Sequence, residues 1–191
     1  MFIRLPELAR QVNARLDKKN ILDLNEIIDL DLYNYMYEDL QKAFKGNKNK
    51  LLKHLYDYGI KEGRVFSYVY DPKYYQEKYA DVKKVFGNDY LAILNHFLTY
   101  GTREGRQGSM TIWSTYYKNK NEQAIKEMTN ADALRHFIKY GIKEWRATSP
   151  DFSVRVYKDS NPDLAKQFKN DCKAYYRHFT KYGIKEHRKY K

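Results

Sequence analysis

One motif occurs four times in this chain of 191 residues, and it constrains the fold more than any other feature. Its copies are HLYDYGIKEGR ending at Arg64, HFLTYGTREGR ending at Arg106, HFIKYGIKEWR ending at Arg146 and HFTKYGIKEHR ending at Arg188. The motif histidines, His54, His96, His136 and His178, are 42, 40 and 42 residues apart. A period of about 20 to 50 residues indicates a repeat protein whose units bury their apolar faces against one another.

The spacing within each unit is that of helices. In the segment from Tyr70 to Ser109, Asp71 followed by Pro72 is typical of an N-cap and a first helical turn. We expect that helix to direct Tyr74, Tyr75, Tyr79 and Val82 inward and to end at Phe86 and Gly87. A second helix is predicted after Asn88 or Asp89, with Tyr90, Ile93, Phe97 and Tyr100 at helical spacing. Strand and hairpin signals are poor. The sequence therefore predicts an all-α fold of four tandem helical hairpins, each with a short third segment, in a solenoid-like or compact array.

We divide the chain into an N-terminal part and four units that form one continuous domain. The N-terminal part, residues 1–28, is predicted to be a capping helix and a linker, because Leu5, Leu8, Val12 and Leu16 have helical spacing. Units 1 to 4 are residues 29–67, 68–109, 110–149 and 150–191. Pro162 predicts that the first helix of unit 4 is split in two. The acidic segment at residues 21–31 is expected to lie against the basic array.

The motif repeats four further residue types in every unit. They are tyrosine (Tyr58, Tyr100, Tyr140, Tyr182), glycine (Gly59, Gly101, Gly141, Gly183), glutamate (Glu62, Glu104, Glu144, Glu186) and the final arginine. A catalytic site is needed once and a packing contact in every unit, so we interpret the set as structural. We expect the histidine and tyrosine to fill the space between units and bond backbone groups. The glycine is expected to be left-handed at a helix end. The glutamate is expected to pair with the arginine of its own or an adjacent unit and to set register between units.

The sequence contains no pattern for a cofactor, a metal or a catalytic centre. Successive motif histidines lie one unit apart, on the order of 10 Å by helix packing distances, so they cannot share an ion. No phosphate-binding glycine loop, serine elbow, HExxH helix or pair of catalytic carboxylates occurs. Cys172, the single cysteine, is interpreted as a small buried hydrophobic residue. We therefore predict a protein that is not an enzyme and has no cofactor.

The charge of the chain points to an anionic partner. A formal net charge of +12 and an isoelectric point near 9.5 predict attraction to polyanions. Each motif has one basic residue before its glutamate, and these are predicted to form a cationic ladder: Lys61, Arg103, Lys143 and Lys185. Further cations of units 3 and 4 join the predicted site: Arg135, Lys139, Lys173, Arg177 and Lys181. Exposed tyrosines among them would stack on bases or sugar rings. The alternative is a solvated face that serves only solubility.

Unit 2 resembles a known bacterial repeat. The segment DPKYYQEKYADVKKVFGNDYLAILNHFLTYGTREGRQGS is similar to a short tyrosine-rich repeat with Tyr-Tyr, Asn-Pro-Asp-Val and Tyr-Gly...Glu-Gly-Arg elements, found in bacterial surface-associated and secreted proteins. NPDL at residues 161–164 supplies the matching tetrapeptide of unit 4. The resemblance covers roughly residues 29–191 and departs from the repeat at Trp145 and His187, where the family has glycine. It implies a binding module.

Three functions are compatible with these features. The first is a cytoplasmic, non-enzymatic protein that docks on nucleic acid or on a nucleic-acid-handling protein complex. An inhibitor that a mobile element carries against a host defence nuclease would be a protein of this kind. MFIRLPELARQV lacks the apolar run of a secretory leader, and no apolar stretch is long enough to cross a bilayer. The second is a cell-envelope module, after removal of a leader, that binds anionic or polysaccharide wall polymers. The third is a protein-only interaction scaffold.

Overall fold

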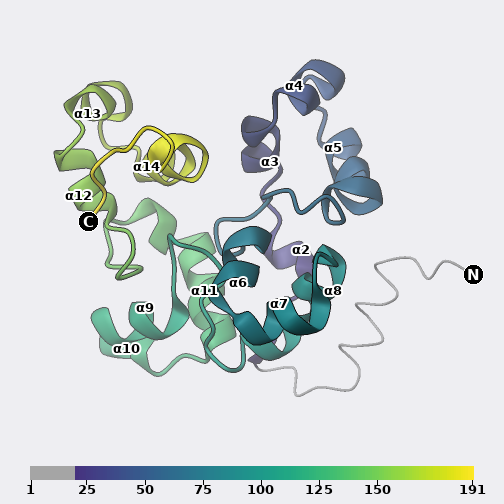
Figure 1. Cartoon of the computed structure of the whole chain (residues 1–191). Helices are drawn as coiled ribbons and strands as arrows, with labels where there is room; N and C mark the ends of the chain where they lie inside the picture. The colour runs from purple at the N-terminus through teal and green to yellow at the C-terminus, as the bar shows by residue number, and fades with distance from the viewer. Residues whose placement is uncertain (1–19) are drawn as a thin grey trace, which may run out of the picture.

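The structure is a computed structural model that describes residues 20–191, and within that range it is all-helical (Figure 1). The described residues form thirteen α-helices and four short π- or 3-10 helices; extended pairing is limited there to an isolated bridge between Ser109 and Ile112. The predicted all-α fold is therefore confirmed. The predicted capping helix, built on Leu5 to Leu16, lies outside the described residues.

Each unit contains three α-helices and a short terminal helix, and α2 (Leu24–Ile27) precedes them. Unit 1 contains α3 (Leu30–Met36), α4 (Glu38–Phe44), α5 (Lys48–His54) and the π-helix η2 (Leu55–Gly59). Unit 2 contains α6 (Pro72–Lys78), α7 (Ala80–Phe86), α8 (Tyr90–His96) and the π-helix η3 (Phe97–Gly101). Unit 3 contains α9 (Ser114–Lys120), α10 (Gln123–Lys126), α11 (Asn130–Lys139) and the 3-10 helix η4 (Gly141–Lys143). Unit 4 contains α12 (Val154–Asp159), α13 (Pro162–Phe168), α14 (Cys172–His178) and the π-helix η5 (Phe179–Gly183).

The predicted first helix of each unit is broken, so a simple hairpin is wrong. In unit 2 the backbone is extended at Tyr79, between α6 and α7. The Tyr79 hydroxyl accepts a hydrogen bond from the N–H of Gln107 at 2.7 Å, which ties the break to the end of the unit. Tyr37 makes the same contact with Val65 in unit 1, at 2.6 Å. The inward positions predicted for this helix fit at Tyr75 and Val82, which are fully buried.

Asparagine replaces this tyrosine in the last two units. The side-chain amide of Asn121 donates to the Ala147 carbonyl at 3.0 Å, and that of Asn161 donates to the Lys189 carbonyl at 3.0 Å. The break in unit 4, between α12 and α13, was the one that Pro162 predicted, and it is confirmed. A tyrosine or an asparagine at this position therefore fastens the middle of each unit to its end.

A backbone hydrogen bond closes each unit on itself. In every case the residue that caps the first helix donates its N–H to a carbonyl near the end of the same unit. The pairs are Asp29 to Phe66 (2.9 Å), Asp71 to Gly108 (2.9 Å), Trp113 to Thr148 (3.0 Å) and Ser153 to Tyr190 (2.9 Å). The recurrence of this bond makes each unit a closed loop of helices, with the motif at its carboxyl-terminal side.

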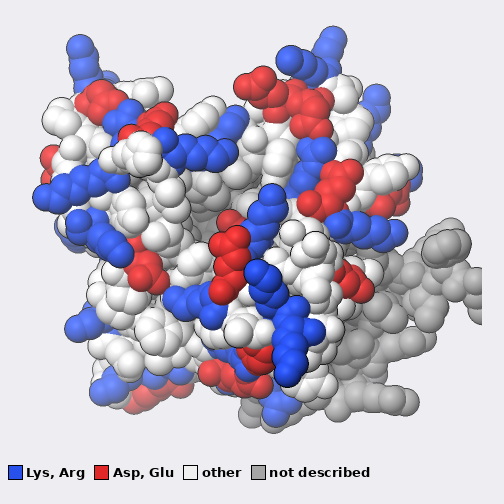
Figure 2. All heavy atoms as spheres, in the orientation of Figure 1, with Lys and Arg blue, Asp and Glu red and all other residues white. Residues whose placement is uncertain are grey.

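The array also closes, because unit 4 contacts unit 1. Lys173 of α14 forms an ion pair of 2.7 Å with Asp29, and Lys181 donates to the Tyr35 carbonyl at 2.7 Å. The Arg177 guanidinium lies 4.9 Å from the centre of the Tyr35 ring. In Figure 1, α14 faces the α3 side of unit 1 across the upper part of the view, and Figure 2 shows the described residues as one continuous body. The compact form of the predicted array is the one observed, and an open solenoid is not.

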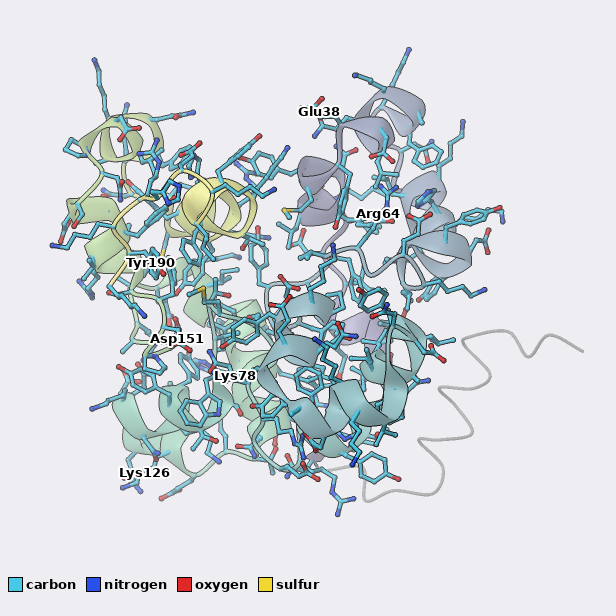
Figure 3. All side chains as sticks on the ribbon, in the orientation of Figure 1. Glu38, Arg64, Lys78, Lys126, Asp151 and Tyr190 are labelled. Carbon is cyan, nitrogen blue, oxygen red and sulfur yellow. The ribbon has the colours of Figure 1, made fainter. Side chains whose placement is uncertain are left out.

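The connectors between units meet in the interior. The Tyr68 carbonyl accepts hydrogen bonds from the Ser109 hydroxyl at 2.6 Å and the Thr111 hydroxyl at 3.0 Å. The Thr111 carbonyl accepts one from the Thr148 hydroxyl at 2.7 Å. All of these residues are buried, and the hydroxyls satisfy backbone groups that water cannot reach. Figure 3 labels one outer contact of this region, where Lys78 of unit 2 lies 3.4 Å from Asp151 of unit 4.

The segment just before unit 1 belongs to the core rather than to a linker. Ile21, Leu22 and the two apolar ends of α2 are buried. Arg135 of α11 holds the segment, with its guanidinium 2.9 Å from Glu26 and 2.7 Å from the Ile21 carbonyl. The expected contact of the acidic segment with the basic array is therefore confirmed at this pair.

Two further observations concern helix length and the cysteine. None of the helices in residues 20–191 is both long enough and apolar enough to cross a membrane. Cys172 is buried at the start of α14, as predicted. Burial raises the pKa of its thiol to about 12, so the thiolate that would react with an electrophile is scarce near neutral pH.

Candidate polyanion-binding site

Each motif histidine is held by a buried tyrosine of its own unit. The Nδ1 atom and the phenol oxygen are 2.9 Å apart in Tyr33–His54, 3.0 Å in Tyr75–His96, 2.9 Å in Tyr117–His136 and 2.8 Å in Tyr157–His178. Burial raises the pKa of all four phenols, which therefore stay protonated. The expectation that the histidine bonds backbone groups between units is wrong, since its partner is a side chain of the same unit.

The buried tyrosine also explains the motif glycine. A Cβ atom on Gly59 or Gly101 would lie 2.1 Å from the phenol oxygen of Tyr33 or Tyr75. At Gly141 that distance to Tyr117 would be 2.3 Å, and at Gly183 the Cβ would lie 2.4 Å from the Phe179 ring. The predicted left-handed conformation is wrong, because the described glycines with positive φ are others: Gly46, Gly63, Gly87 and Gly105. The motif glycine is required by close approach, not by backbone conformation.

The motif glutamate and arginine close the end of their own unit. Arg64 bonds Glu62 at 2.5 Å and Asp39 of α4 at 2.8 Å, and Arg106 bonds Glu104 at 2.5 Å and Asp81 of α7 at 2.7 Å. Arg146 pairs with Glu144 and Glu122, and Arg188 pairs with Glu186 and Asp163. Hydrogen bonds from Arg106 and Arg188 lower the pKa of Asp81 and Asp163, respectively. None of these pairs joins two units, so the expected role in register between units is not observed.

Three motif tyrosines lie on the surface, although the sequence predicted packing. Tyr58, Tyr100 and Tyr140 are 58%, 52% and 46% exposed. Each ring centre lies close to that of the motif histidine, at 5.5, 5.8 and 5.3 Å respectively. Tyr182 differs, because it is only partly exposed and lies 6.2 Å from the Tyr35 ring of unit 1. Units 1 to 3 therefore each present a phenol ring to solvent.

The basic residue that follows each of these tyrosines is exposed as well. Lys61, Arg103, Lys143 and Lys185 all lie on the surface, and none forms an ion pair with another described residue. They contrast with the motif arginines, each of which binds two carboxylates. Arg103 also helps to line a surface hollow, together with Asn20, Tyr100 and Glu104. No carboxylate of residues 20–191 neutralises the charge of these four cations.

The remaining predicted cations have different surroundings. Arg135 holds the amino-terminal segment, and Arg177 and Lys181 hold unit 1 against unit 4, so these three serve the fold. Lys173 has the same role through Asp29. Lys139 is exposed, with its ammonium 4.9 Å from the Tyr140 ring centre, and stays in the candidate site.

The excess positive charge is dispersed over the face that Figure 2 shows. Lysine and arginine side chains alternate there with aspartate and glutamate over all four units, without one continuous basic field. The candidate site is therefore a set of separate positions. We call each exposed pair a tyrosine–cation station: Tyr58 with Lys61, Tyr100 with Arg103, and Tyr140 with Lys143.

Sequence reasoning placed Tyr75 in the interior, but it did not identify the four buried tyrosines as the partners of the motif histidines. Each of these tyrosines lies four residues after the residue that caps the first helix of its unit. The recurrence of a tyrosine at this position in all four units was the sequence signal that could have identified them: Tyr33, Tyr75, Tyr117 and Tyr157. In residues 20–191, no three histidine, cysteine, aspartate or glutamate side chains gather as a metal site would require. No family model, curated protein or solved structure matches the chain.

Proposed function

We propose that the protein is a non-enzymatic binding protein that docks on a polyanion, and that this polyanion is nucleic acid, alone or within a nucleic-acid-handling complex. One observation supports the proposal most directly. The four motif cations Lys61, Arg103, Lys143 and Lys185 are exposed without an ion-pair partner in the described chain, while the neighbouring motif arginines are all paired. A phosphate backbone provides the missing counter-charges and releases its own counterions on binding.

The net charge supports the same function. At +12 the chain attracts a polyanion, and at about 0.1 M salt this attraction acts over a screening length of about 10 Å. Such a role calls for a cytoplasmic location, where nucleic acid is accessible. An inhibitor of a nucleic-acid-handling defence complex would use the same surface.

Binding to a labelled 20-nucleotide oligonucleotide, measured by fluorescence anisotropy at 50 and 200 mM salt, tests the proposal. We expect the affinity to fall by about tenfold or more between these salt concentrations if several phosphates are neutralised. Changing Lys61, Arg103, Lys143 and Lys185 together to glutamate should abolish binding.

A charge-matched control separates the site from the net charge. Lys73, Lys83, Lys84 and Lys126 are exposed and lie outside the motif, and their joint change to glutamate alters the net charge by the same amount. This control should retain most of the affinity. Equal losses in both variants would leave only non-specific attraction, and binding that does not depend on salt would contradict the proposal.

The exposed tyrosines also suit the sugar rings of a cell-wall polymer, which is the second candidate function. A pull-down on purified cell walls, with and without their anionic polymers, distinguishes the two. Retention on walls together with no binding to oligonucleotides would favour the envelope function.

A further inference from the structure

In each tyrosine–cation station the cation follows the tyrosine by three residues. In units 1 and 2 the backbone is helical from the tyrosine to the cation: the Glu62 N–H donates to the Tyr58 carbonyl at 3.0 Å, and the Glu104 N–H to the Tyr100 carbonyl at 2.9 Å. In unit 3 the Lys143 N–H donates to the Tyr140 carbonyl at 2.9 Å. Residues three apart on one turn lie on the same side of the helix, so the cation and the ring of each station face the same direction.

The motif histidine supports the tyrosine ring of each station. The tyrosine ring lies within 5.3 to 5.8 Å of the motif histidine ring, and that histidine is fixed by its hydrogen bond to a fully buried tyrosine. Tyrosine has only two side-chain torsions to fix, so a ring supported in this way loses little entropy when a ligand stacks on it. A supported aromatic ring beside a cation is the arrangement that binds a base and its phosphate.

The exposed rings of Tyr58, Tyr100 and Tyr140 favour one form of nucleic acid over the other. Duplex DNA is stiff, with a persistence length of about 50 nm, and its bases are stacked inside. A single strand bends freely and exposes the faces of its bases.

We propose that the ligand is single-stranded nucleic acid, whose bases stack on Tyr58, Tyr100 and Tyr140 while the adjacent cations contact its phosphates. This inference rests on the proposed function and names the form of its ligand. The fourth motif tyrosine, Tyr182, is not part of the stacking surface, because it packs near Tyr35. Stacking does not depend on base identity, so little sequence preference is expected.

The test compares a labelled 20-nucleotide thymidine strand with a hairpin duplex of the same length, by anisotropy at 50 mM salt. The wild-type protein should bind the strand more tightly. Changing Tyr58, Tyr100 and Tyr140 to alanine should weaken strand binding by about 5-fold or more for each base stacked, and should leave duplex binding unchanged. Changing the same residues to phenylalanine should preserve strand binding, because the ring remains.

Folding is controlled with circular dichroism and a leucine variant. If the alanine variant unfolds, the triple leucine variant keeps an apolar side chain against the histidine but removes the aromatic face, and strand affinity should fall as for alanine. Equal affinity for strand and duplex, or no effect of alanine or leucine in a folded protein, overturns this inference and leaves the proposed function standing. Failure of the wild-type protein to bind either oligonucleotide overturns the proposed function itself.

Discussion

The phenol oxygen of Tyr75 lies 3.0 Å from Nδ1 of His96, and it occupies the space that a side chain on the following motif glycine would need. The hydrogen bond recurs in all four units, and the phenol oxygen is the atom nearest to the missing Cβ in units 1 to 3, whereas in unit 4 the Phe179 ring is nearer to Gly183. It explains why a histidine, a glycine and a distant tyrosine recur together: the buried phenol needs a polar partner, and its helix can approach only a residue without a Cβ atom.

Changing Tyr75 to phenylalanine should therefore cost about 1 to 2 kcal/mol of unfolding free energy, because His96 loses its partner in a half-buried position. Urea denaturation measures the loss. Changing Tyr100 to phenylalanine is the matched control; this hydroxyl is exposed, and its removal should cost close to nothing. Equal effects at the two positions would contradict the assignment of the buried hydrogen bond.

The motif glycine gives a second comparison. Changing Gly101 to alanine places a Cβ atom 2.1 Å from the Tyr75 phenol oxygen, and overpacking of this kind should cost about 3 kcal/mol or more. Gly87 has a φ of +54°, but a Cβ atom there would meet no other atom within 4 Å, so its change to alanine adds backbone strain without a clash and should cost about 1 to 2 kcal/mol. Thermal unfolding of both variants tests the order, and a larger loss at Gly87 would show that conformation, not close approach, selects the glycine.

The fold class was predictable and the interior of the units was not, for reasons that particular residues illustrate. Helical spacing and the Asp71–Pro72 start predicted helices correctly. Tyr79 breaks its helix through a hydrogen bond to Gln107, a contact across 28 residues that local spacing cannot reveal. The phenols that explain Gly101 and Gly141 also come from other helices.

The candidate site was also predictable from the sequence only in part. Charge and recurrence suggested outward positions for Lys61 and Lys143, and both are exposed. The same reasoning gave Arg135 and Lys181 the same role, although each bonds a group more than 100 residues away in the sequence. A cation's partner is set by tertiary contacts, so composition alone does not distinguish a binding lysine from a structural one.

Stability should fall as the pH drops below about 6.5. Burial lowers the pKa of His96 and His178 in the folded protein, more than the nearby carboxylates raise it. The unfolded chain then binds more protons than the folded one below its ordinary histidine pKa of about 6.5, so the unfolding free energy decreases with falling pH. Urea midpoints between pH 7.5 and 5.5 measure the effect.

A control assigns this loss to the two histidines. Asp81 and Asp163 have lowered pKa values, so the stability that they contribute is lost only below about pH 4. Changing His96 and His178 to glutamine should flatten the profile between pH 7.5 and 5.5, whereas changing the exposed His187 should not. An unchanged slope in the double variant would contradict the role of His96 and His178.

The ion pairs between the motif arginine and its two carboxylates should contribute stability that depends on salt. Arg106 binds Glu104 and Asp81 and lies 4.9 Å from the Tyr79 ring centre, so its change to alanine should cost about 1 to 2 kcal/mol. The difference should shrink in 0.5 M sodium chloride, because the carboxylates are partly exposed. Arg103, exposed and without an ion pair in the described chain, is the control and should change stability little. Equal losses would show that net charge, not pairing, sets the effect.

One position of the motif should distinguish unit 4 from the others. The residue after the motif glycine is buried in units 1 to 3, where Ile60, Thr102 and Ile142 are 3%, 0% and 2% exposed, but Ile184 is 53% exposed. Units 1 to 3 are each followed by another unit, and the turn after this position contacts it: Gly63 lies against Tyr90, and the Trp145 ring lies 5.5 Å from that of Tyr175. Among residues 20–191, no such unit covers Ile184.

Changing Ile142 to lysine should cost about 3 kcal/mol or more, because a charge would be buried without a partner, while Ile184 to lysine should stay within about 0.5 kcal/mol of the wild type. Urea denaturation of both variants measures this, and an equally large loss at Ile184 would mean that a surface outside residues 20–191 covers unit 4 in solution.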